Sequence, residues 1–263
     1  MNTKYAVNVE NMKVSLSGKE ILHNISWKVK RGAKYFILGA NGSGKTTLVR
    51  TLLGYIWAHY GANVEVLGNK YWHCDVNEVR KLIAWVSPFF QKTVEGATTG
   101  VDVILSGKTG TLGFFRAATS DELEEVKNLL VSMNGLHLAN KDFLKMSSGE
   151  QMKILVARAL IANPELMIFD EPSVYLDIAE RENFLRIVDR LAKERDDLTI
   201  IFISQRIEDI LPSFSEGMIL KNGQIEVEGQ RDEILTSTTL KKAFGVDIRL
   251  IKTENGRLWS VVE

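Results

Sequence analysis

One short glycine-rich run limits what this chain can fold into more than any other stretch. It reads Gly39-Ala40-Asn41-Gly42-Ser43-Gly44-Lys45-Thr46. The apolar run 35–38 before it has the pattern of a strand buried on both faces, and residues 46–53 after it read as a helix. Glycine tolerates the dihedral angles that turn backbone N–H groups inward, and the helix adds its positive end. The sequence therefore predicts a loop that cradles a triphosphate, in preference to a chance glycine-rich turn.

The side chains of this loop indicate how a nucleotide would be held. Lys45 would reach the β- and γ-phosphates, which makes it a catalytic as well as a binding residue. Thr46 would ligate Mg²⁺, and Thr47 would contact the inner phosphates. The other loop residues assigned to nucleotide binding are Gly39, Asn41, Gly42, Ser43 and Gly44. A nucleotide and Mg²⁺ are therefore the expected ligands.

Two further apolar runs predict the fold class. Residues 166–169 and 199–203 read as buried strands, and between them apolar residues recur at helical spacing. Strand, helix and strand in this order form a parallel sheet with a right-handed crossover. Residues 7–10 and 25–29 alternate as half-buried strands of an antiparallel edge sheet do. We therefore expect an α/β fold.

An acidic pair follows the strand 166–169. Asp170 ends this strand, and a carboxylate at such a strand end can hold Mg²⁺ through its water shell. Glu171 stands beside it, and the charge of the metal would offset the repulsion between the two carboxylates. The alternative is an acidic surface turn before Pro172.

A third motif lies between the phosphate loop and the acidic pair. It reads Met146-Ser147-Ser148-Gly149-Glu150-Gln151. Its first five residues resemble the Leu-Ser-Gly-Gly-Gln signature of the ATP-binding subunits of ABC transporters. The resemblance runs over almost the whole chain and keeps the motifs in the same order. Taken alone, the six residues would fit an ordinary helix cap equally well.

The resemblance implies ATP as the nucleotide, hydrolysis as the reaction, and Glu171 as the residue that polarises the attacking water. Ser147, Gly149 and Glu150 would contact the γ-phosphate held by another subunit. The partner would be a second copy of the chain or a paralogous subunit, arranged head to tail around two ATP molecules. Residues 173–177 resemble the D-loop, in which Asp177 belongs to the site. Asp177 can also cap the helix that follows it.

The resemblance also divides the chain. It implies that residues 1–228 form an ABC ATPase domain. This domain would have an α/β P-loop NTPase (RecA-like) core, an antiparallel β subdomain and an α-helical subdomain over about 88–161. Residues 229–263 form a C-terminal extension with short helices near 232–235 and 240–244. Asn255-Gly256 then predicts a hairpin of residues 248–252 and 258–262. This extension resembles that of ATPases for metal-chelate uptake and of a related group associated with molybdenum transport.

Three positions depart from the pattern of the family. Gln91 is the candidate for the glutamine that links Mg²⁺ to the membrane partner, although it follows the strand residue Val86 later than usual; Ser87 or water is the alternative. Leu16 occupies the region where an aromatic side chain is expected to stack on adenine, with Tyr5 or Tyr35 as possible substitutes. Each of these tyrosines also suits a structural role.

The third departure is Gln205, at the position of the switch histidine. Glutamine can donate a hydrogen bond to the γ-phosphate, but it carries neither a proton nor a charge between groups. Slow turnover is therefore expected. The alternative is that Gln205 lies outside the site.

Composition excludes several classes of protein. The 33 basic and 33 acidic residues balance, which argues against a nucleic-acid partner. No stretch approaches the ~20 apolar residues of a membrane span, and the start of the chain lacks the core of a secretion signal. The lone Cys74 excludes an internal disulfide framework and suits the cytoplasm. Together with this composition, the resemblance implies a cytoplasmic protein, peripheral on the inner face of the membrane, that docks on separate permease subunits.

Two competing hypotheses stay open at this point. One is a soluble ABC ATPase without a membrane partner. The other is a nucleotide-gated module that hydrolyses poorly because of Gln205.

Overall fold

The computed structural model describes residues 4–94, 98–110 and 117–263. Residues 1–3 lie outside the described residues; they belong to the start of the chain, which was predicted to lack the apolar core of a secretion signal. Residues 95–97 and 111–116, which belong to the expected helical subdomain, also lie outside the described residues. Within the described part, none of the helices combines the length and apolar character needed to cross a bilayer.

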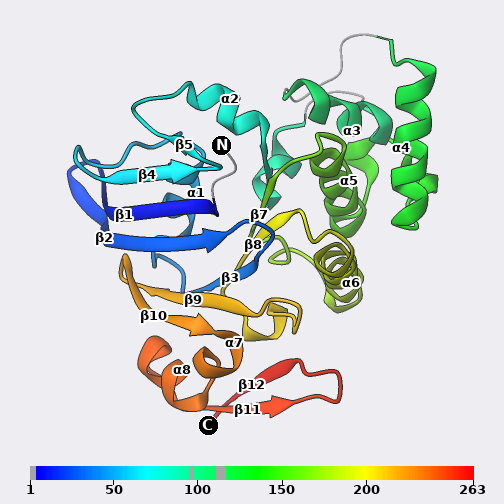
Figure 1. Cartoon of the computed structure of the whole chain (residues 1–263). Coiled ribbons are helices and arrows are strands. Elements are labelled where there is room, and N and C mark those ends of the chain that lie inside the picture. The colour runs from blue at the N-terminus through cyan, green and yellow to red at the C-terminus, as the bar shows by residue number, and fades with distance from the viewer. Residues whose placement is uncertain (1–3, 95–97, 111–116) are drawn as a thin grey trace.

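A mixed sheet forms the centre of the molecule (Figure 1). Its strand order is β10 (Gln224–Gln230), β9 (Glu216–Lys221), β3 (Lys34–Leu38), β8 (Thr199–Ser204), β7 (Leu166–Asp170) and β6 (Ile83–Val86). The strands from β9 to β6 are parallel, and β10 pairs antiparallel with β9. The predicted α/β fold with a P-loop core is confirmed.

The central strands separate two hydrophobic cores. Successive residues of a strand point to opposite faces, so Phe36 and Leu38 enter one core while Tyr35 and Ile37 enter the other. The same alternation holds along β7 and β8. Continuous apolar runs are needed here because both faces of these strands are covered.

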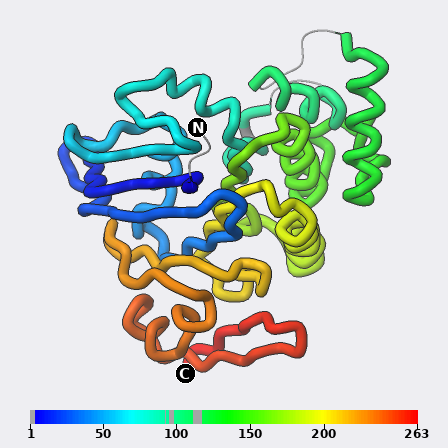
Figure 2. Tube along the Cα trace, in the orientation of Figure 1, coloured from blue at the N-terminus to red at the C-terminus, as the bar shows by residue number. Residues whose placement is uncertain are grey.

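The antiparallel strands form a sheet of their own. It runs in the order β2 (Lys19–Lys30), β1 (Tyr5–Leu16), β4 (Asn63–Val66) and β5 (Asn69–Lys70). The predicted antiparallel β subdomain is confirmed as this separate layer (blue to cyan in Figure 2). β1 and β2 extend beyond the predicted ranges 7–10 and 25–29, β1 pairs with β4, and β4 pairs with β5. Their buried face packs against one core with α1 (Lys45–Leu52).

Among the described residues, four further helices cover the other face and one end of the central sheet, and a fifth packs in the same core as α1 through Val76 and Val79. They are α2 (Val76–Lys81), α3 (Gly100–Thr109), α4 (Ser120–Ser132), α5 (Ser148–Ile161) and α6 (Ile178–Glu194), with short 3₁₀ turns η1 (Pro88–Lys92), η2 (Leu136–Leu138), η3 (Phe143–Lys145) and η4 (Ile207–Asp209). Between 101 and 161 the described residues contain helices and turns but no strand, as the apolar pattern predicted. This helical block lies to one side of the sheet (Figure 1).

The C-terminal segment contains α7 (Arg231–Ile234), α8 (Ser237–Phe244) and the hairpin β11 (Ile248–Lys252) and β12 (Leu258–Val262). These are the helices and the hairpin that the sequence predicted. The expected boundary after residue 228 falls inside β10, so the extension begins in space at α7. Ile248 and Leu258 are buried in the same core as α6, which attaches the hairpin to the main body.

Candidate active site

The carboxyl ends of three adjacent strands bring the predicted motifs to one edge of the sheet. The phosphate loop follows β3, Asp170 ends β7 and Gln205 follows β8. β8 pairs in parallel with both β3 and β7. The N–H of Gly39 also donates to the carbonyl of Ser204, at 3.3 Å. Ligands of open α/β sheets bind at such an edge.

The phosphate loop has the backbone that its glycines allow. Gly42 and Gly44 have φ of 77° and 104°, in the left-handed region that other residues rarely adopt. The Lys45 side chain is buried beneath the loop, and its Nζ donates to the carbonyls of Gly39 and Ala40, both at 2.8 Å. The cationic group is therefore held at the start of α1, where the helix end itself attracts anions.

Asp170 and Glu171 differ sharply in environment. Asp170 is only 4% exposed, and burial together with the charge of Glu171 raises its pKa to about 6. Glu171 is partly exposed, has a φ of 50°, and donates its N–H to the carbonyl of Ile203 at 3.0 Å. A positive φ is unusual for glutamate, and strained backbone of this kind often marks functional positions.

The two carboxylates line a cavity of about 280 Å³. Its walls are Thr46, Arg50, Trp85, Ser87, Pro88, Phe89, Asp170, Glu171, Val174 and Tyr175. Asp170 Oδ1 is buried without a hydrogen-bond partner among the described residues, and Thr46 and Glu171 add further oxygens to the cavity wall. Buried orphan oxygens are costly unless a ligand satisfies them, so the oxygen-rich arrangement fits Mg²⁺.

Sequence reasoning missed Arg50 and Trp85 in this cavity. Arg50 stands four residues after Thr46, one helical turn along α1, so helical spacing could have placed it on the same face. Trp85 lies on β6, beside the strand of Asp170, and only the strand order shows this.

Gln91 lies elsewhere. Its Nε2 donates to the carbonyl of Ser148 at 3.0 Å, at the start of α5. The residues of this segment that line the cavity are Ser87, Pro88 and Phe89, and Gln91 is not among them. The structure thus joins Gln91 to the signature motif and does not bring it to Thr46 and Asp170.

Leu16 and Gln205 are both accessible to solvent. Leu16 ends β1 at the tight turn to β2 and is 38% exposed. Tyr35, one proposed substitute for an adenine-stacking residue, is a core residue whose hydroxyl donates to Glu228 at 2.9 Å. Tyr5 begins β1, at the opposite end of the strand from Leu16. Gln205 is partly exposed beside the phosphate loop.

The signature motif forms the start of α5. Ser147 is its exposed N-cap: its Oγ accepts the N–H of Glu150 at 3.2 Å, and the Glu150 carboxylate accepts the N–H of Ser147 at 2.8 Å. The cap uses Ser147 Oγ as an acceptor, so its hydroxyl proton stays available to a phosphate. The capping and anion-binding interpretations of this motif are therefore compatible.

Glu150 brings a charge where the signature of the family has a neutral glutamine. Lys141 Nζ lies 2.6 Å from Glu150 Oε2, and His137 Nε2 lies 3.8 Å from Oε1. The hydrogen bond from Lys141 holds the pKa of Glu150 below its ordinary value. The carboxylate is thus ionised and largely compensated by the lysine.

Asp177 stands at the start of α6, which lies against the signature motif. It caps α6 by accepting the N–H of Glu180 at 2.8 Å, which confirms the predicted N-cap. A Cβ on Gly149 would come within 2.7 Å of the Glu180 side chain, so the starts of α5 and α6 are in contact.

This fold and this site together define a P-loop nucleotide-binding protein with a paired-carboxylate cavity. The profile of the family described as ABC transporter matches residues 22–174. The chain belongs to this family, among its ATP-binding subunits, and is an ATPase.

Three known proteins illustrate the likeness. A putative ABC transporter ATP-binding protein of Streptococcus mutans is 29% identical over 96% of this chain and 97% of its own length. The uncharacterised ABC transporter ATP-binding protein YlmA of Bacillus subtilis is 31% identical over 92% of both chains. An inward-facing structure of a putative metal-chelate type ABC transporter has a TM-score of 0.80 at 23% identity, covering 99% of this chain and 97% of its own.

Proposed function

We propose that this chain powers a transporter by closing, as a head-to-tail pair with a second copy or a paralogous subunit, around two Mg-ATP. The observation that carries the proposal is the single cavity lined by Thr46, Asp170 and Glu171, directly beside buried Lys45. The signature motif stands exposed at the start of α5, ready for the phosphate of a partner.

Each residue has a distinct task in this proposal. Lys45 binds the β- and γ-phosphates as they develop charge, and Glu171 orients the attacking water and accepts its proton. Thr46 and Asp170 would hold Mg²⁺, which supplies positive charge to the phosphates when bound. Ser147 and the N–H groups that begin α5 would bind the γ-phosphate presented by the partner.

We further propose that the chain docks on separate permease subunits at the inner face of the membrane. The exposed Phe89 stacks near Trp85, and Phe90 packs under Arg158, so an aromatic surface lies at the junction of the core and the helical block. A permease segment seated there would touch the wall of the ATP cavity. The C-terminal extension resembles those of ATPases for metal-chelate uptake and of the group associated with molybdenum transport, so the cargo we propose is a metal chelate or an oxyanion.

The experiment for ATP binding compares wild type with Lys45→Ala by calorimetry with Mg-ATP. Lys45→Ala should lose most binding, because it removes the buried ammonium from the loop. Unchanged affinity would overturn the site.

The pair is tested by sedimentation at high ATP. Ser147→Arg should block ATP-driven pairing while leaving the affinity of the monomer for ATP intact, since Ser147 lies outside the phosphate loop. Loss of monomer binding would contradict the head-to-tail arrangement. Co-purification with a many-span membrane protein tests the permease partner, and failure to find one would favour the soluble ATPase.

A further inference from the structure

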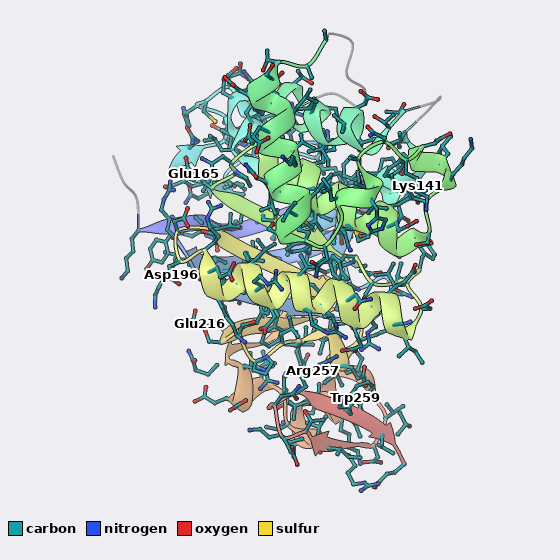
Figure 3. All side chains as sticks on the ribbon, turned by 90° about the vertical axis from the view of Figure 1, so that its right-hand side faces the viewer. Lys141, Glu165, Asp196, Glu216, Arg257 and Trp259 are labelled. Carbon is teal, nitrogen blue, oxygen red and sulfur yellow. The ribbon has the colours of Figure 1, made fainter. Side chains whose placement is uncertain are left out.

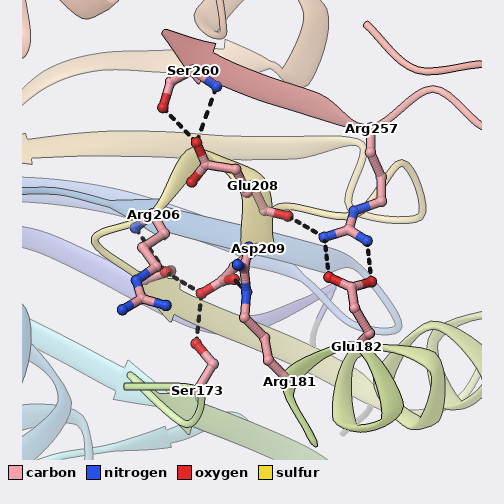
Figure 4. A network of polar contacts seen from close by, with 9 residues as sticks. Ser173, Arg181, Glu182, Arg206, Glu208, Asp209, Arg257 and Ser260 are labelled. Carbon is pink, nitrogen blue, oxygen red and sulfur yellow. Dashed lines mark hydrogen bonds and ion pairs between the residues drawn. The ribbon is translucent and has the colours of Figure 1, made fainter. Parts of the chain in front are cut away.

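A buried carboxylate joins the segments around Gln205 and Glu171. Asp209 is fully buried, and its Oδ2 accepts hydrogen bonds from Ser173 Oγ at 2.6 Å and Ser204 Oγ at 2.9 Å. Its Oδ1 accepts the Nε–H of Arg181 at 2.6 Å (Figure 4). Ser173 follows Glu171 by two residues, and Ser204 directly precedes Gln205.

The C-terminal hairpin holds the neighbour of this carboxylate. Ser260 of β12 donates its N–H to Glu208 Oε1 at 3.0 Å, and its hydroxyl donates to the same oxygen. Arg257 donates to the backbone carbonyl of Glu208 at 2.7 Å and grips the Glu182 carboxylate of α6 with both terminal nitrogens. Figure 4 shows the hairpin reaching η4 and α6 through these groups.

Packing and charge both stabilise the attachment of the hairpin to η4 and α6. Trp259 lies 5.7 Å from the guanidinium of Arg181 and 5.5 Å from that of Arg257, on the side of the hairpin toward α6 (Figure 3). Burial alone would raise the pKa of Glu208, but the hydrogen bonds from Ser260, a backbone hydrogen bond and the charge of Arg181 together hold the pKa below its ordinary value. The charged Glu208 therefore prefers the attached hairpin.

The polar bonds of the hairpin do more than attach it to the main body, because of the segments that they reach. Apolar residues such as Leu258 already fix the hairpin to the core. The polar bonds of the hairpin reach η4, one residue beyond Arg206, and the helix that follows the D-loop. The N–H of Arg206 in turn donates to Ser204 Oγ at 2.9 Å, so both flanks of Gln205 belong to one bonded unit.

We propose that Arg257 and Ser260 are positioning residues for ATP hydrolysis, which hold the segment 204–209 so that Gln205 and Glu171 face the same phosphate. The inference rests on the proposed catalytic roles of these two residues. The hairpin holds Glu208, and the next residue, Asp209, binds both Ser173 of the D-loop and Ser204. The position of the hairpin therefore fixes the position of the D-loop relative to Gln205. The C-terminal extension is thereby part of the hydrolytic machinery, although it contributes no group to the cavity.

The test compares Arg257→Met with Arg249→Met in the full chain. Arg249 lies on the same hairpin, is exposed, and pairs with Glu263 at 3.1 Å, away from η4. Arg257→Met should lower kcat roughly 10- to 100-fold, the size of effect that a misplacement of about 1 Å can produce. Its KM for ATP and its ATP affinity should stay within about twofold of wild type, because the phosphate loop is untouched. Arg249→Met should match wild type in all three.

A double-mutant cycle separates positioning from general weakening. In a Gln205→Ala background, Arg257→Met should cost much less than it does in wild type, because the residue it positions is already gone.

Ser260→Ala removes a single hydroxyl and should also lower kcat, by a smaller factor than Arg257→Met does. If Arg257→Met folds poorly, Ser260→Ala still tests the inference.

Several results would overturn the inference. They are an unchanged kcat in both Arg257→Met and Ser260→Ala, an equal fall in Arg249→Met, or full independence of Arg257 and Gln205 in the cycle. A wild-type chain that binds no ATP would instead overturn the proposed function, and this inference with it. The results that overturn only the inference require a wild-type chain that hydrolyses ATP. They can therefore be told apart from a failure of the proposed function.

Discussion

Lys45 and Glu171 form an ion pair in the candidate active site, with Nζ and Oε1 3.0 Å apart. An ammonium group has three donors, of which the carbonyls of Gly39 and Ala40 accept two. A phosphate that binds Lys45 would take the remaining donor and replace Glu171 as the nearby anion. Because the loop carbonyls are fixed by the backbone, Glu171 is the partner most easily displaced, and its carboxylate is then free to face water.

Glu171→Gln should separate binding from hydrolysis. The neutral amide competes less with phosphate for Lys45, so ATP affinity should equal or exceed that of wild type. Hydrolysis should fall by ~10²–10⁴, the usual contribution of a positioned general base. Calorimetry with Mg-ATP and steady-state phosphate release measure the two effects. A variant that hydrolyses at the wild-type rate would remove Glu171 from the role of base.

Asp170→Asn should stabilise the protein in Mg²⁺-free buffer near pH 8. Burial raises the pKa of Asp170 from 3.8 to about 6, so below pH 3.8 the carboxyl is neutral in both the folded and unfolded states. Between these values only the unfolded chain ionises and stability falls with rising pH; above about 6 the full cost, about 3 kcal/mol, is present.

Thermal unfolding at two pH values measures this effect. The melting temperature of Asp170→Asn should exceed that of wild type by several degrees at pH 8, and the difference should shrink toward pH 4. Asp189→Asn is the matched control, because Asp189 is a partly exposed carboxylate on α6 that pairs with Lys193 at 2.7 Å. A gain from Asp170→Asn that is the same at both pH values would contradict a cost of buried charge.

Lys141→Ala should weaken ATP-driven pairing through Glu150. Without Lys141, the Glu150 carboxylate faces the phosphate-binding end of α5 uncompensated. We expect a loss of about 0.5–1 kcal/mol, or roughly twofold to fivefold, in the pairing constant. Adding Glu150→Gln should restore pairing, since it removes the charge that Lys141 offsets.

Sedimentation in a Glu171→Gln background measures this pairing. Lys145→Ala serves as the control, because Lys145 is exposed and pairs with Asp142 at 3.5 Å. Equal losses in the two lysine variants would point to the overall charge of this region and away from Glu150.

The parts of the fold that the sequence predicted are those set by local pattern. The buried strands β3, β7 and β8 are continuous apolar runs, and the hairpin β11–β12 has Asn255-Gly256 at its turn. The short β4 and β5 carry no comparable signal, since β4 is a strand through its pairing with β1, and β5 through its pairing with β4. The extent of β1 was likewise decided by its pairing with β2.

The residues of the candidate site also fall into two groups: those placed by local sequence and those placed by contacts distant in the chain. Lys45 and Asp170 were predictable because each belongs to a contiguous motif whose backbone conformation follows from its own residues. Gln91 was assigned by distance along the chain, yet a hydrogen bond to Ser148, 57 residues away, decides where it lies. Asp209 was overlooked for the same reason: its link to Ser173 spans 36 residues and follows no local spacing.

Gln205 provides the sharpest remaining test of the mechanism. The carbonyl of Ser204 accepts the N–H of Gly39 at 3.3 Å, which places the start of the phosphate loop beside the residue before Gln205. Gln205 itself is partly exposed at the carboxyl edge of the sheet. Gln205→Ala should lower kcat roughly 10- to 100-fold, the range for a lost hydrogen bond to a charged group. Gln205→His should raise kcat, because imidazole can hold the γ-phosphate and also exchange a proton. Phosphate release from the three proteins decides the matter: equal rates would place Gln205 outside the mechanism and leave Glu171 alone with the water.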